Sequence, residues 1–461
     1  MFLISRGEIN GRIDPDMILY RRKILKFNFP VKQLKHLLKD KPQYGSNQAG
    51  IDRSSEKEAR YIRITDIDEY GLLKNNLGAT AEFVEEKYLL NNNDILFARS
   101  GATVGKAYLH KSKSVNHECF FAGYMIRFLV NENLLSPDFL FSYTQLDVYK
   151  EWTKAIQRAA GQPNINAEEY KSLNIPLPPL EIQAEIISIF ETAYHSKKQK
   201  ETQAAQLLAS IDGYLLEALG ITLPPTSEKK TFFITNSSKI SGGRFDPLFH
   251  EIDIFAIFKA GNFELVAIKE LAHYLKTGFA AGKQDQDLDD KGVIQIRPTN
   301  VKEPDRDLTF NKNVYIKISE VENRPADLLQ KGEILFNNTN SQELVGKTTL
   351  FDLGGDYFCS NHMTRIGTTE KINHAYLTAV LNLYQHLRVF YRMCVNWNNQ
   401  SGVNTEMLRN IKIPLPPLEK QTEIADHISA LRLQAKQLQH EAQTELERAK
   451  VEVERLILGE K

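Results

Sequence analysis

The sequence predicts an α+β (mixed α/β) protein built from a duplicated unit, in which each copy is a globular domain followed by a long helix. Three observations predict it. The segment "IPLPPLEIQAEI" from Ile175 recurs as "IPLPPLEKQTEI" from Ile413. Short apolar runs of strand length alternate with helical patterns in both halves. After the second copy, roughly 40 residues without Gly or Pro can form one helix of about 60 Å.

The composition is that of a globular protein. At 461 residues, with 42% hydrophobic and 25% charged residues, the chain has room for several folded domains. Its formal net charge is +0, so overall charge neither favours nor excludes a polyanionic partner. Cys119, Cys359 and Cys394 are too scattered for a disulfide framework or a zinc site, which favours a reducing compartment. No apolar run is long enough for a signal peptide or a membrane span. We therefore expect a cytoplasmic protein with no membrane partner.

The duplication extends well beyond the opening pair of segments. The other matched segments occur in the same order in both halves, which chance would not reproduce. They are "GRIDPD" from Gly11 and "GRFDPL" from Gly243, "RITDI" from Arg63 and "RPTNV" from Arg297, "DILF" from Asp94 and "EILF" from Glu333, "VGK" from Val104 and from Val345, "INAEEY" from Ile165 and "VNTEML" from Val403, and "LLEALG" ending at Gly220 and "RLILG" ending at Gly459.

Within the first copy, the elements can be assigned in chain order. The runs "YIRITDI", "DILFAR" and "YMIRFLV" have the length and the β-branched or aromatic content of strands. The stretch "SPDFLFSYTQLDVYKEW" has a helical pattern, with Ser136 and Asp138 near its expected cap. The order of the strands in a sheet does not follow from these patterns.

The repeated proline segment predicts the entrance to a helix. Pro176, Pro178 and Pro179 keep the chain extended, and Pro is tolerated where a helix begins because its missing N–H would have no partner there. Glu181 and Glu185 place negative charge near the positive end of the helix dipole. The second copy repeats the pattern, so each copy predicts a helix directly after the prolines.

The apolar residues of the two long helices predict a coiled-coil seam, because their spacings alternate between three and four. One such stripe needs a partner, so we expect an antiparallel pair of helices; the alternative is that each helix packs on its own globular domain. Lys197 and Lys200 interrupt the stripe of the first helix. The predicted seam consists of Ile186, Phe190, Ala193, Ala204, Leu208, Ile211, Leu215 and Ala218 in the first helix and Ile424, Ile428, Leu431, Ala435, Leu438, Ala442, Leu446, Ala449, Val453 and Leu456 in the second.

A search for catalytic motifs finds none. "GATVGKA" from Gly101 lacks the spacing and the hydroxyl of a phosphate-binding loop, and a structural turn explains it better. The proline pairs lack the Asn or Asp and the aromatic residue of an adenine methyltransferase motif, and "EPDRD" from Glu303 lacks the partners of a nuclease site. The histidines show no metal-ligand spacing. We expect no catalysis, no cofactor and no metal in this chain.

Polar loops at equivalent places in the two halves are the candidate functional sites. Arg, Asn and Gln side chains match base edges, whereas Lys, Ser and Thr suit phosphates. Such loops are often only loops, but they recur here with different residues in each copy, which suggests one scaffold that reads two different sequences. The candidate DNA-contacting residues are Arg63, Thr65, Arg99, Ser100, Thr103, Lys106, Gln162, Asn164 and Asn166 in the first half and Arg297, Thr299, Asn300, Asn337, Asn338, Thr339, Asn340, Gln342, Lys347, Asn398, Asn399, Gln400 and Asn404 in the second.

The doubled "IPLPPLE" helix entrance, with "RIDP", "RFDP", "VGK" and "IDGYLLEALGI", resembles the specificity subunit of type I restriction-modification systems over essentially the whole chain. The resemblance implies a target recognition domain at residues 1–178, a spacer helix at 179–220, a second recognition domain at 221–416 and a second spacer helix at 417–461. It also implies that each domain reads half of a split DNA sequence. Because the polar loops differ, the two half-sites are expected to differ.

The same resemblance implies the partners and the chemistry. Double-stranded DNA, two modification (methyltransferase) subunits and restriction (translocase and nuclease) subunits are the expected partners. S-adenosylmethionine, ATP and Mg are expected on those partner subunits and not on this chain. Two other functions remain open at this point: a self-contained DNA methyltransferase or nuclease with unrecognised motifs, and a coiled-coil adaptor with no role in DNA binding.

Overall fold

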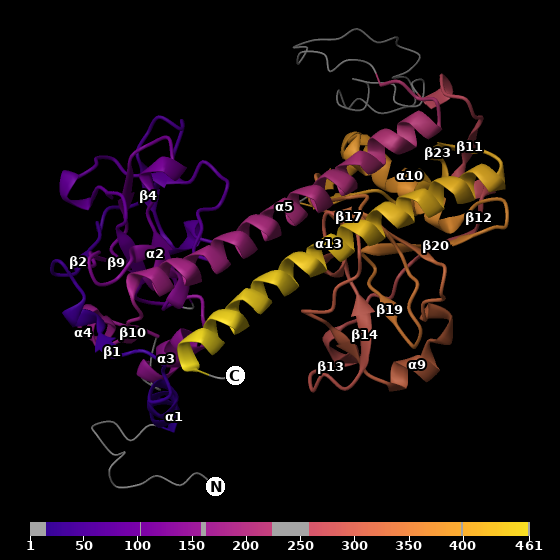
Figure 1. Ribbon diagram of the computed structural model, residues 1–461. Helices are drawn as coiled ribbons and strands as arrows, with labels where there is room; N and C mark the ends of the chain where they lie inside the picture. The colour runs from indigo at the N-terminus through magenta and orange to yellow at the C-terminus, as the bar shows by residue number, and fades with distance from the viewer. Residues whose placement is uncertain (1–14, 102, 158–162, 224–257, 398–399, 460–461) are drawn as a thin grey trace. The chain divides into compact units, whose positions relative to one another are not determined.

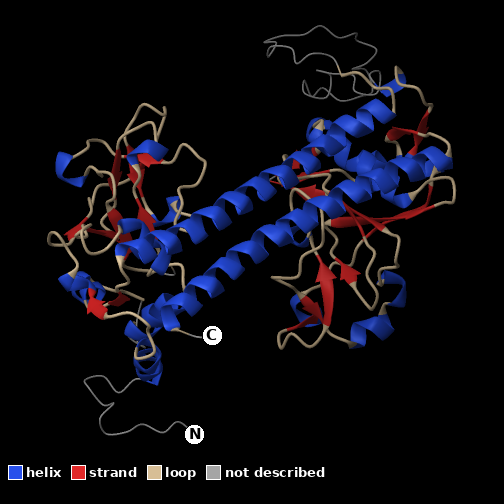
Figure 2. Cartoon of the chain, viewed as in Figure 1, coloured by secondary structure: helices blue, strands red, loops and turns tan. Residues whose placement is uncertain are grey.

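The computed structural model describes residues 15–101, 103–157, 163–223, 258–397 and 400–459. The chain divides into unit 1, residues 1–200 with 440–461, and unit 2, residues 201–439. Each unit combines strands and helices (Figure 2), which confirms the predicted mixed fold class. Three candidate residues lie outside the described residues, namely Gln162, Asn398 and Asn399, and so do "GRFDPL" and most of "GRIDPD".

Unit 1 contains short strands, short helices and parts of two long helices. Its strands are β1 (Val31–Gln33), β2 (Gln43–Tyr44), β3 (Ile51–Asp52), β4 (Arg60–Ile62), β5 (Ala79–Thr80), β6 (Ile95–Ala98), β7 (Ala107–Leu109), β8 (Cys119–Phe121), β9 (Met125–Phe128) and β10 (Asn174–Pro176). Its shorter helices are α1 (Pro15–Ile24), α2 (Pro137–Tyr143), α3 (Asp147–Ile156) and α4 (Ala167–Lys171). The long helices are α5 (Leu180–Ala218) and α13 (Leu418–Leu458), which both units share.

Unit 2 repeats this order of elements. Its strands are β11 (Leu265–Ala267), β12 (Ala272–Thr277), β13 (Gln286–Asp287), β14 (Val293–Ile296), β15 (Tyr315–Ile316), β16 (Ile334–Asn337), β17 (Thr339–Asn340), β18 (Thr348–Leu350), β19 (Phe358–Cys359), β20 (Met363–Thr368), β21 (Val395–Trp397), β22 (Gln400–Gly402) and β23 (Lys412–Pro414). Its shorter helices are α9 (Ser319–Asn323), α10 (His374–His386), α11 (Val389–Met393) and α12 (Thr405–Arg409).

The strand orders of the two units correspond one to one. Unit 1 has the sheets β2-β9-β6-β7 and β3-β5-β4-β8 and the ribbon β1-β10. Unit 2 has β12-β20-β16-β18, β13-β15-β14-β19 and β11-β23. In both units one strand pair is parallel, β4 with β8 and β14 with β19. The predicted duplication is therefore confirmed in the topology, and unit 2 has a further sheet, β17-β22-β21.

Two local predictions differ from the structure. In "YIRITDI" the strand ends at Ile62, and a 3-10 turn follows at Ile64–Asp66. The helical stretch from Ser136 is split into α2 and α3, where one continuous helix, α10, occupies the corresponding place in unit 2. At the break, the Thr144 hydroxyl donates a hydrogen bond to the Phe141 carbonyl at 2.6 Å, which offers the backbone an alternative to continuing the helix.

The repeated proline segment joins a strand to a long helix in both units. Its first residues form the strands β10 and β23, and the helices begin at Leu180 and Leu418. The repeated Gln of the motif is buried in each copy. The Gln183 amide accepts a hydrogen bond from the Ser136 N–H and donates one to the Pro178 carbonyl. Gln421 makes the same two bonds, with Asn373 and Pro416. The repetition of this segment is therefore structural, because its Gln clamps the start of α2 or α10 to the start of the long helix.

The two long helices also end in the same way. Gly220 and Gly459 follow α5 and α13 with φ of 66° and 69°, the left-handed conformation that favours glycine after a helix. The Asn262 N–H donates to the Leu219 carbonyl at 3.0 Å, and the Asn28 N–H donates to the Ile457 carbonyl at 2.8 Å. Each helix end is thus satisfied by an Asn from its own unit.

Within each unit α5 and α13 run antiparallel, as predicted for a coiled coil. In unit 1 the hydroxyl of Ser196 is bonded to Glu445 and the ammonium of Lys200 to Glu441, and in unit 2 the rings of Tyr214 and His427 are stacked with centroids 4.0 Å apart. Most of the predicted seam residues belong to the same hydrophobic cores as the globular domains. Helix–helix and helix–domain packing therefore occur together (Figure 1).

The ends of the predicted seam need a correction. Leu456 is 36% exposed, whereas Ile457 is fully buried, and Leu219 is more deeply buried than Ala218. Both helices therefore finish the seam with a step of four residues, from Leu215 to Leu219 and from Val453 to Ile457, where the prediction used a step of three. Leu208, Leu431 and Leu438 are half-buried, and the other predicted seam residues are buried.

Candidate nucleic-acid interface

Four segments of this neutral chain contain no acidic residue. In unit 1 they lie between Asp94 and Glu118 and between Glu151 and Glu168. In unit 2 they lie between Glu333 and Glu343 and between Glu370 and Glu406. The segments include the predicted polar loops except the turns at Arg63 and Arg297 and the loop end at Lys347, which follows Glu343, and three of the four contain Lys or Arg. They are among several acid-free segments of the chain, and within each of them a phosphate backbone would meet no carboxylate.

The structure brings the two segments of each unit together by the same backbone hydrogen bond. In unit 1 the Ile165 N–H donates to the Arg99 carbonyl at 2.8 Å, and Ser100 faces Asn164 in an antiparallel bridge. In unit 2 the Val403 N–H donates to the Asn338 carbonyl at 2.9 Å. There the contact is a longer pairing of β17 with β22, with Thr339 opposite Gly402. Two polar loops that are far apart in the sequence therefore form one surface in each unit.

The surface of unit 1, called polar edge 1, consists of Tyr44, Arg99, Ser100, Tyr124 and Asn164. The Arg99 guanidinium lies over the Tyr44 ring, 4.9 Å from its centroid. The Arg99 N–H donates to the Tyr124 carbonyl at 2.9 Å, and the Tyr124 side chain is 67% exposed. Asn164 is exposed as well. Polar edge 1 thus combines a cation, an amide and two aromatic rings.

The surface of unit 2, called polar edge 2, consists of Thr339, Asn340, His362, Trp397 and Gln400. The Asn338 N–H donates to the His362 carbonyl at 3.0 Å, so that His362 occupies the place of Tyr124. His362, Trp397 and Gln400 are exposed, and Thr339 and Asn340 are half-buried. Polar edge 2 has the same backbone plan as polar edge 1 with different side chains.

Several predicted residues instead hold the fold together. Asn166 and Asn404 are the N-caps of α4 and α12, and their side chains accept the N–H groups of Glu169 and Met407. Asn300 is buried; its side chain accepts the Arg297 N–H and donates to the Thr309 carbonyl at 2.9 Å. Its side-chain donors and acceptor are thus used within the fold, and a direct contact of Asn300 with DNA stays a prediction.

Three further candidates in unit 2 are also buried. The Asn337 amide donates to the Leu344 carbonyl, and the Asn338 amide donates to the Thr364 hydroxyl at 2.9 Å. The Lys347 ammonium donates to the Val301 carbonyl at 3.3 Å, and burial lowers the pKa of Lys347. These residues pin the turn after β16 to the domain, and none of them is placed to contact DNA directly.

The remaining candidates are accessible to different degrees. Thr65 and Thr299 are exposed at equivalent turns. Arg63 is half-buried beside Asp66, whose carboxylate raises the pKa of the guanidinium, and Arg297 bonds Gln295 at 2.9 Å. Lys106 bonds the Ile67 carbonyl at 3.3 Å, in the manner of Lys347. Thr103 and Gln342 are half-buried, and Gln342 donates to the Tyr391 carbonyl at 2.9 Å.

Sequence reasoning missed four aromatic side chains of the two edges: Tyr44, Tyr124, His362 and Trp397. Trp397 lies inside the acid-free segment between Glu370 and Glu406, and this position could have identified it. Tyr124 and His362 lie outside the four segments, so no such signal was present for them in the sequence. Tyr44 belongs to a segment far away in the sequence, and only the tertiary structure places it under Arg99.

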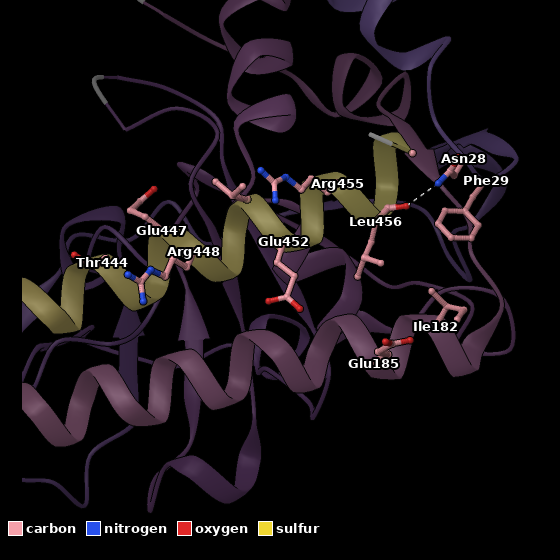
Figure 3. Close-up of a pocket in the computed structure, with 12 residues that line it drawn as sticks. Asn28, Phe29, Ile182, Glu185, Thr444, Glu447, Arg448, Glu452, Arg455 and Leu456 are labelled. Carbon is pink, nitrogen blue, oxygen red and sulfur yellow. Dashed lines mark hydrogen bonds between the residues drawn. The ribbon is translucent and has the colours of Figure 1, made fainter. Parts of the chain in front are cut away.

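Unit 1 also contains an open groove where α13 ends. It has a volume of about 1070 Å³ and is lined by residues of α13, the start of α5 and the chain before β1. Figure 3 shows Arg448, Glu452 and Arg455 along this face of α13, and the Asn28 amide donating to the Leu456 carbonyl at 3.2 Å. Val451 and Leu456 are exposed in the groove. The groove is therefore lined by both apolar and charged side chains of α13 and α5.

Other kinds of site are not evident among the described residues. Within those ranges no three His, Cys, Asp or Glu side chains gather as a metal ion would require. No helix in the described part of the chain is long and apolar enough to cross a membrane. The polar edges and the groove are therefore the surfaces that carry the functional argument.

Comparisons with known proteins give a consistent result. The family model described as type I restriction modification DNA specificity domain matches residues 46–209 and again 261–448. A type I restriction enzyme specificity subunit of Methanocaldococcus jannaschii is 22% identical over 396 residues, which are 83% of this chain and 82% of that protein. A further protein of that organism is 28% identical over 171 residues, which are 36% of this chain but only 39% of that protein.

One solved structure supports the fold. It is a chain from work on complex assembly and conformational transition of the type I R-M system. It has 15% sequence identity and a TM-score of 0.54, and the match covers 94% of this chain and 98% of that chain.

Proposed function

Because the chain belongs to the family of type I restriction-modification DNA specificity domains, we propose that it is the subunit that recognises the DNA sequence for such a system and performs no chemistry itself. S-adenosylmethionine, ATP and Mg would then be bound by partner subunits. The specificity subunit named among its relatives spans most of this chain, which supports the same role for the whole protein.

The observation that carries the proposal is the repeated joining of acid-free polar loops. The same backbone hydrogen bond, from Ile165 to Arg99 and from Val403 to Asn338, builds one polar edge in each unit. Each edge offers amides, hydroxyls and aromatic rings, the groups that contact base edges and phosphates. A coiled-coil adaptor without a DNA role would have no use for two such surfaces.

Each unit reads one half of a bipartite target in this proposal, and the target is asymmetric. The two edges share their backbone, but Tyr124 and Asn164 in unit 1 are replaced by His362 and Gly402 in unit 2. Base discrimination depends on the donors and acceptors of the side chains, so different side chains on one scaffold select different bases.

The long helices set the spacer between the half-sites and carry the partner subunits. α5 has 39 residues and α13 has 41. Helices of that length fix a distance in a way that flexible linkers do not. The groove at the end of α13 is a place for a modification subunit, since it exposes Val451 and Leu456 between the charges of Glu447 and Arg455.

Mapping methylated bases tests the proposal. The chain is co-expressed with a type I modification subunit, and methylated adenines are mapped in the cellular DNA. We expect one asymmetric motif made of two short sequences and a constant spacer. Replacing residues 1–174 by the equivalent segment of another specificity subunit should change one half of the motif and leave the other half unchanged.

Two results would contradict the proposal. Methylation by the purified chain without partner subunits would make it a self-contained enzyme. A change in both halves of the motif after the exchange would show that the units do not read independently.

A further inference from the structure

The sheet β17-β22-β21 exists in unit 2 and has no counterpart among the described residues of unit 1, where Ser100 and Asn164 form a single bridge. We infer that this sheet enters the major groove of the second half-site, with Gln400 reading a base edge and Trp397 packing on the bases beside it. The inference rests on the proposed function and deepens it, because it names the reading element of one half-site.

The pairing of the strands defines an outer face. Val395 lies opposite Gly402, and Trp397 lies opposite Gln400. Because side chains alternate along a strand, these four residues share one face with Thr339, which pairs with Gly402 on the other side. Trp397 is 46% exposed and Val395 is 47% exposed, and Gln400 is exposed too. An apolar ring and a free amide therefore stand side by side on an open face.

Gly402 makes this arrangement possible. A Cβ atom at Gly402 would lie 2.4 Å from the Trp397 indole, closer than side-chain atoms approach one another. Glycine at this position therefore leaves room for the indole next to β22. The Trp397 ring packs against Gly402 and is still 46% exposed, as expected of a side chain that packs against a partner.

The sheet is braced on its opposite face and is attached to unit 2 through β17. Ser401 is buried, and its hydroxyl donates to the Asn396 side chain at 2.6 Å. β17 follows directly on the buried strand β16, and Gln342 ties the next turn to α11 through the Tyr391 carbonyl. Since the backbone is fixed on this side, Gln400 and Trp397 are presented in one geometry, which base discrimination requires.

The charge around the sheet suits DNA. The chain has no acidic residue from Lys371 to Thr405, and that span contains Arg388, which is exposed, and Arg392. The major groove, about 12 Å wide, admits a β-ribbon. A Gln side chain pairs with adenine through two hydrogen bonds, and the charge of the exposed Arg388 suits phosphates.

The test uses the full chain in complex with its modification subunit, on duplexes that carry the mapped target. The variants are Gln400→Ala, Trp397→Ala and Trp397→Phe. Leu288→Ala is the matched control, because Leu288 is 90% exposed in unit 2 and lies outside the sheet. Asn164→Ala is the control for the first half-site.

We expect Gln400→Ala to lower discrimination about tenfold at one base pair of the second half-site and at no position of the first. Trp397→Ala should weaken binding several-fold, with Trp397→Phe between it and the wild type. Leu288→Ala should match the wild type, and Asn164→Ala should change only the first half-site.

Each alternative result has a distinct meaning. If the wild-type complex shows sequence-specific methylation but the Gln400 and Trp397 variants behave like Leu288→Ala, the inference is overturned and the proposed function stands. Equal losses at both half-sites would also overturn it, because the sheet would then act through folding and not through contact. If the wild-type complex has no sequence preference at all, the proposed function itself fails.

Discussion

The loop that follows β4 in unit 1 and the loop that follows β14 in unit 2 both rest on the long helices, but they do so with opposite chemistry. In unit 1 the contact is Tyr70, which lies over the buried Lys197 ammonium at 4.3 Å from the ring centroid. The Tyr70 hydroxyl also donates to Gln443 at 3.1 Å. An aromatic ring thus covers a lysine that interrupts the apolar seam.

In unit 2 the direct contact is Asp307, whose carboxylate pairs with Lys436 of α13 at 3.0 Å. The neighbouring Arg306 is buried and bonds Glu303, Gln385 and His386. His386 in turn bonds Asp212 of α5 at 2.7 Å. The nearby seam of unit 2 is apolar, with Ile211, Leu215, Ile424 and Ile428. In unit 1 the seam beside the loop contains a lysine and the loop supplies an aromatic ring, whereas in unit 2 the nearby seam is apolar and the loop is charged.

This comparison shows which parts of the duplicated unit are interchangeable. The buried Gln183 and Gln421 and the helix-ending Gly220 and Gly459 are the same residue types in both units. They satisfy backbone groups, which do not depend on the sequence around them. Side chains that contact other side chains differ between the units together with their partners. Tyr70, for example, covers Lys197 in unit 1, and Arg306 in unit 2 has a different set of polar partners.

The buried ion pairs of the two sheets allow the strongest test of this equivalence. Arg127 bonds Asp94 in unit 1, and Arg365 bonds Glu333 in unit 2. Glu333→Ala should lower the free energy of unfolding by about 3–5 kcal/mol, since it leaves a buried guanidinium without its partner. Asp94→Ala should cost less, because Arg127 is 13% exposed against 4% for Arg365 and burial already raises the pKa of Asp94. Urea denaturation measures both.

The control for this prediction is the double variant Glu333→Leu with Arg365→Met, which removes both charges and should recover much of the stability. If the double variant were as unstable as the single one, the loss would come from packing and not from an unpaired charge.

Lowering the pH should destabilise unit 1 more than unit 2. His110 is buried in unit 1, and burial, with His117 nearby, lowers the pKa of His110 from 6.5 to about 4. The unfolded chain then takes up a proton between those values and the folded chain does not, so stability falls as the pH falls through this range. The loss from pH 7 to pH 5 is about 2 kcal/mol. Hydrogen exchange should speed up in β7 more than in β18.

The residue that unit 2 has at the equivalent position supplies the matched variant. Phe351 follows β18 as His110 follows β7. The Phe351 N–H donates to the Glu333 carbonyl, and the His110 N–H donates to the Asp94 carbonyl. His110→Phe should flatten the pH dependence of unit 1. An unchanged slope would mean that His117, whose pKa is also lowered by burial, accounts for the effect.

The smallest expected effect concerns Tyr70, in the loop that follows β4 of unit 1. Tyr70→Phe removes the hydrogen bond to Gln443 and should cost about 1 kcal/mol or less. Tyr70→Leu removes the cation–π contact with Lys197 as well, and should cost about 1–2 kcal/mol. Thermal denaturation of both variants is compared with Tyr124→Phe, a change at an exposed ring. Equal stability of the Phe and Leu variants would show that the Lys197 contact contributes nothing.

Part of the fold and of the candidate site could be predicted from the sequence. The helix entrances at Leu180 and Leu418 lie next to the prolines that predicted them, and β6, β9 and their turns follow from short apolar runs. The ends of the seam were misjudged by one residue, at Leu456 and Ala218, because the spacing pattern alone does not decide between a step of three and a step of four. The structure joins the predicted polar loops in pairs, but the sequence did not separate their exposed residues from their buried ones.

By itself, the sequence determined the duplicated plan, the lengths of the two helices and the position of the polar loops. Prolines, helix-ending glycines and apolar periodicity act over a few residues, so they can be recognised without a structure. Only the tertiary structure decided that Asn300, Asn337 and Lys347 point inward and that Trp397 stands on the surface. Exposure depends on strand pairings such as Thr339 with Gly402, which join residues more than sixty positions apart, and local patterns contain no information about which distant segment will cover a side chain.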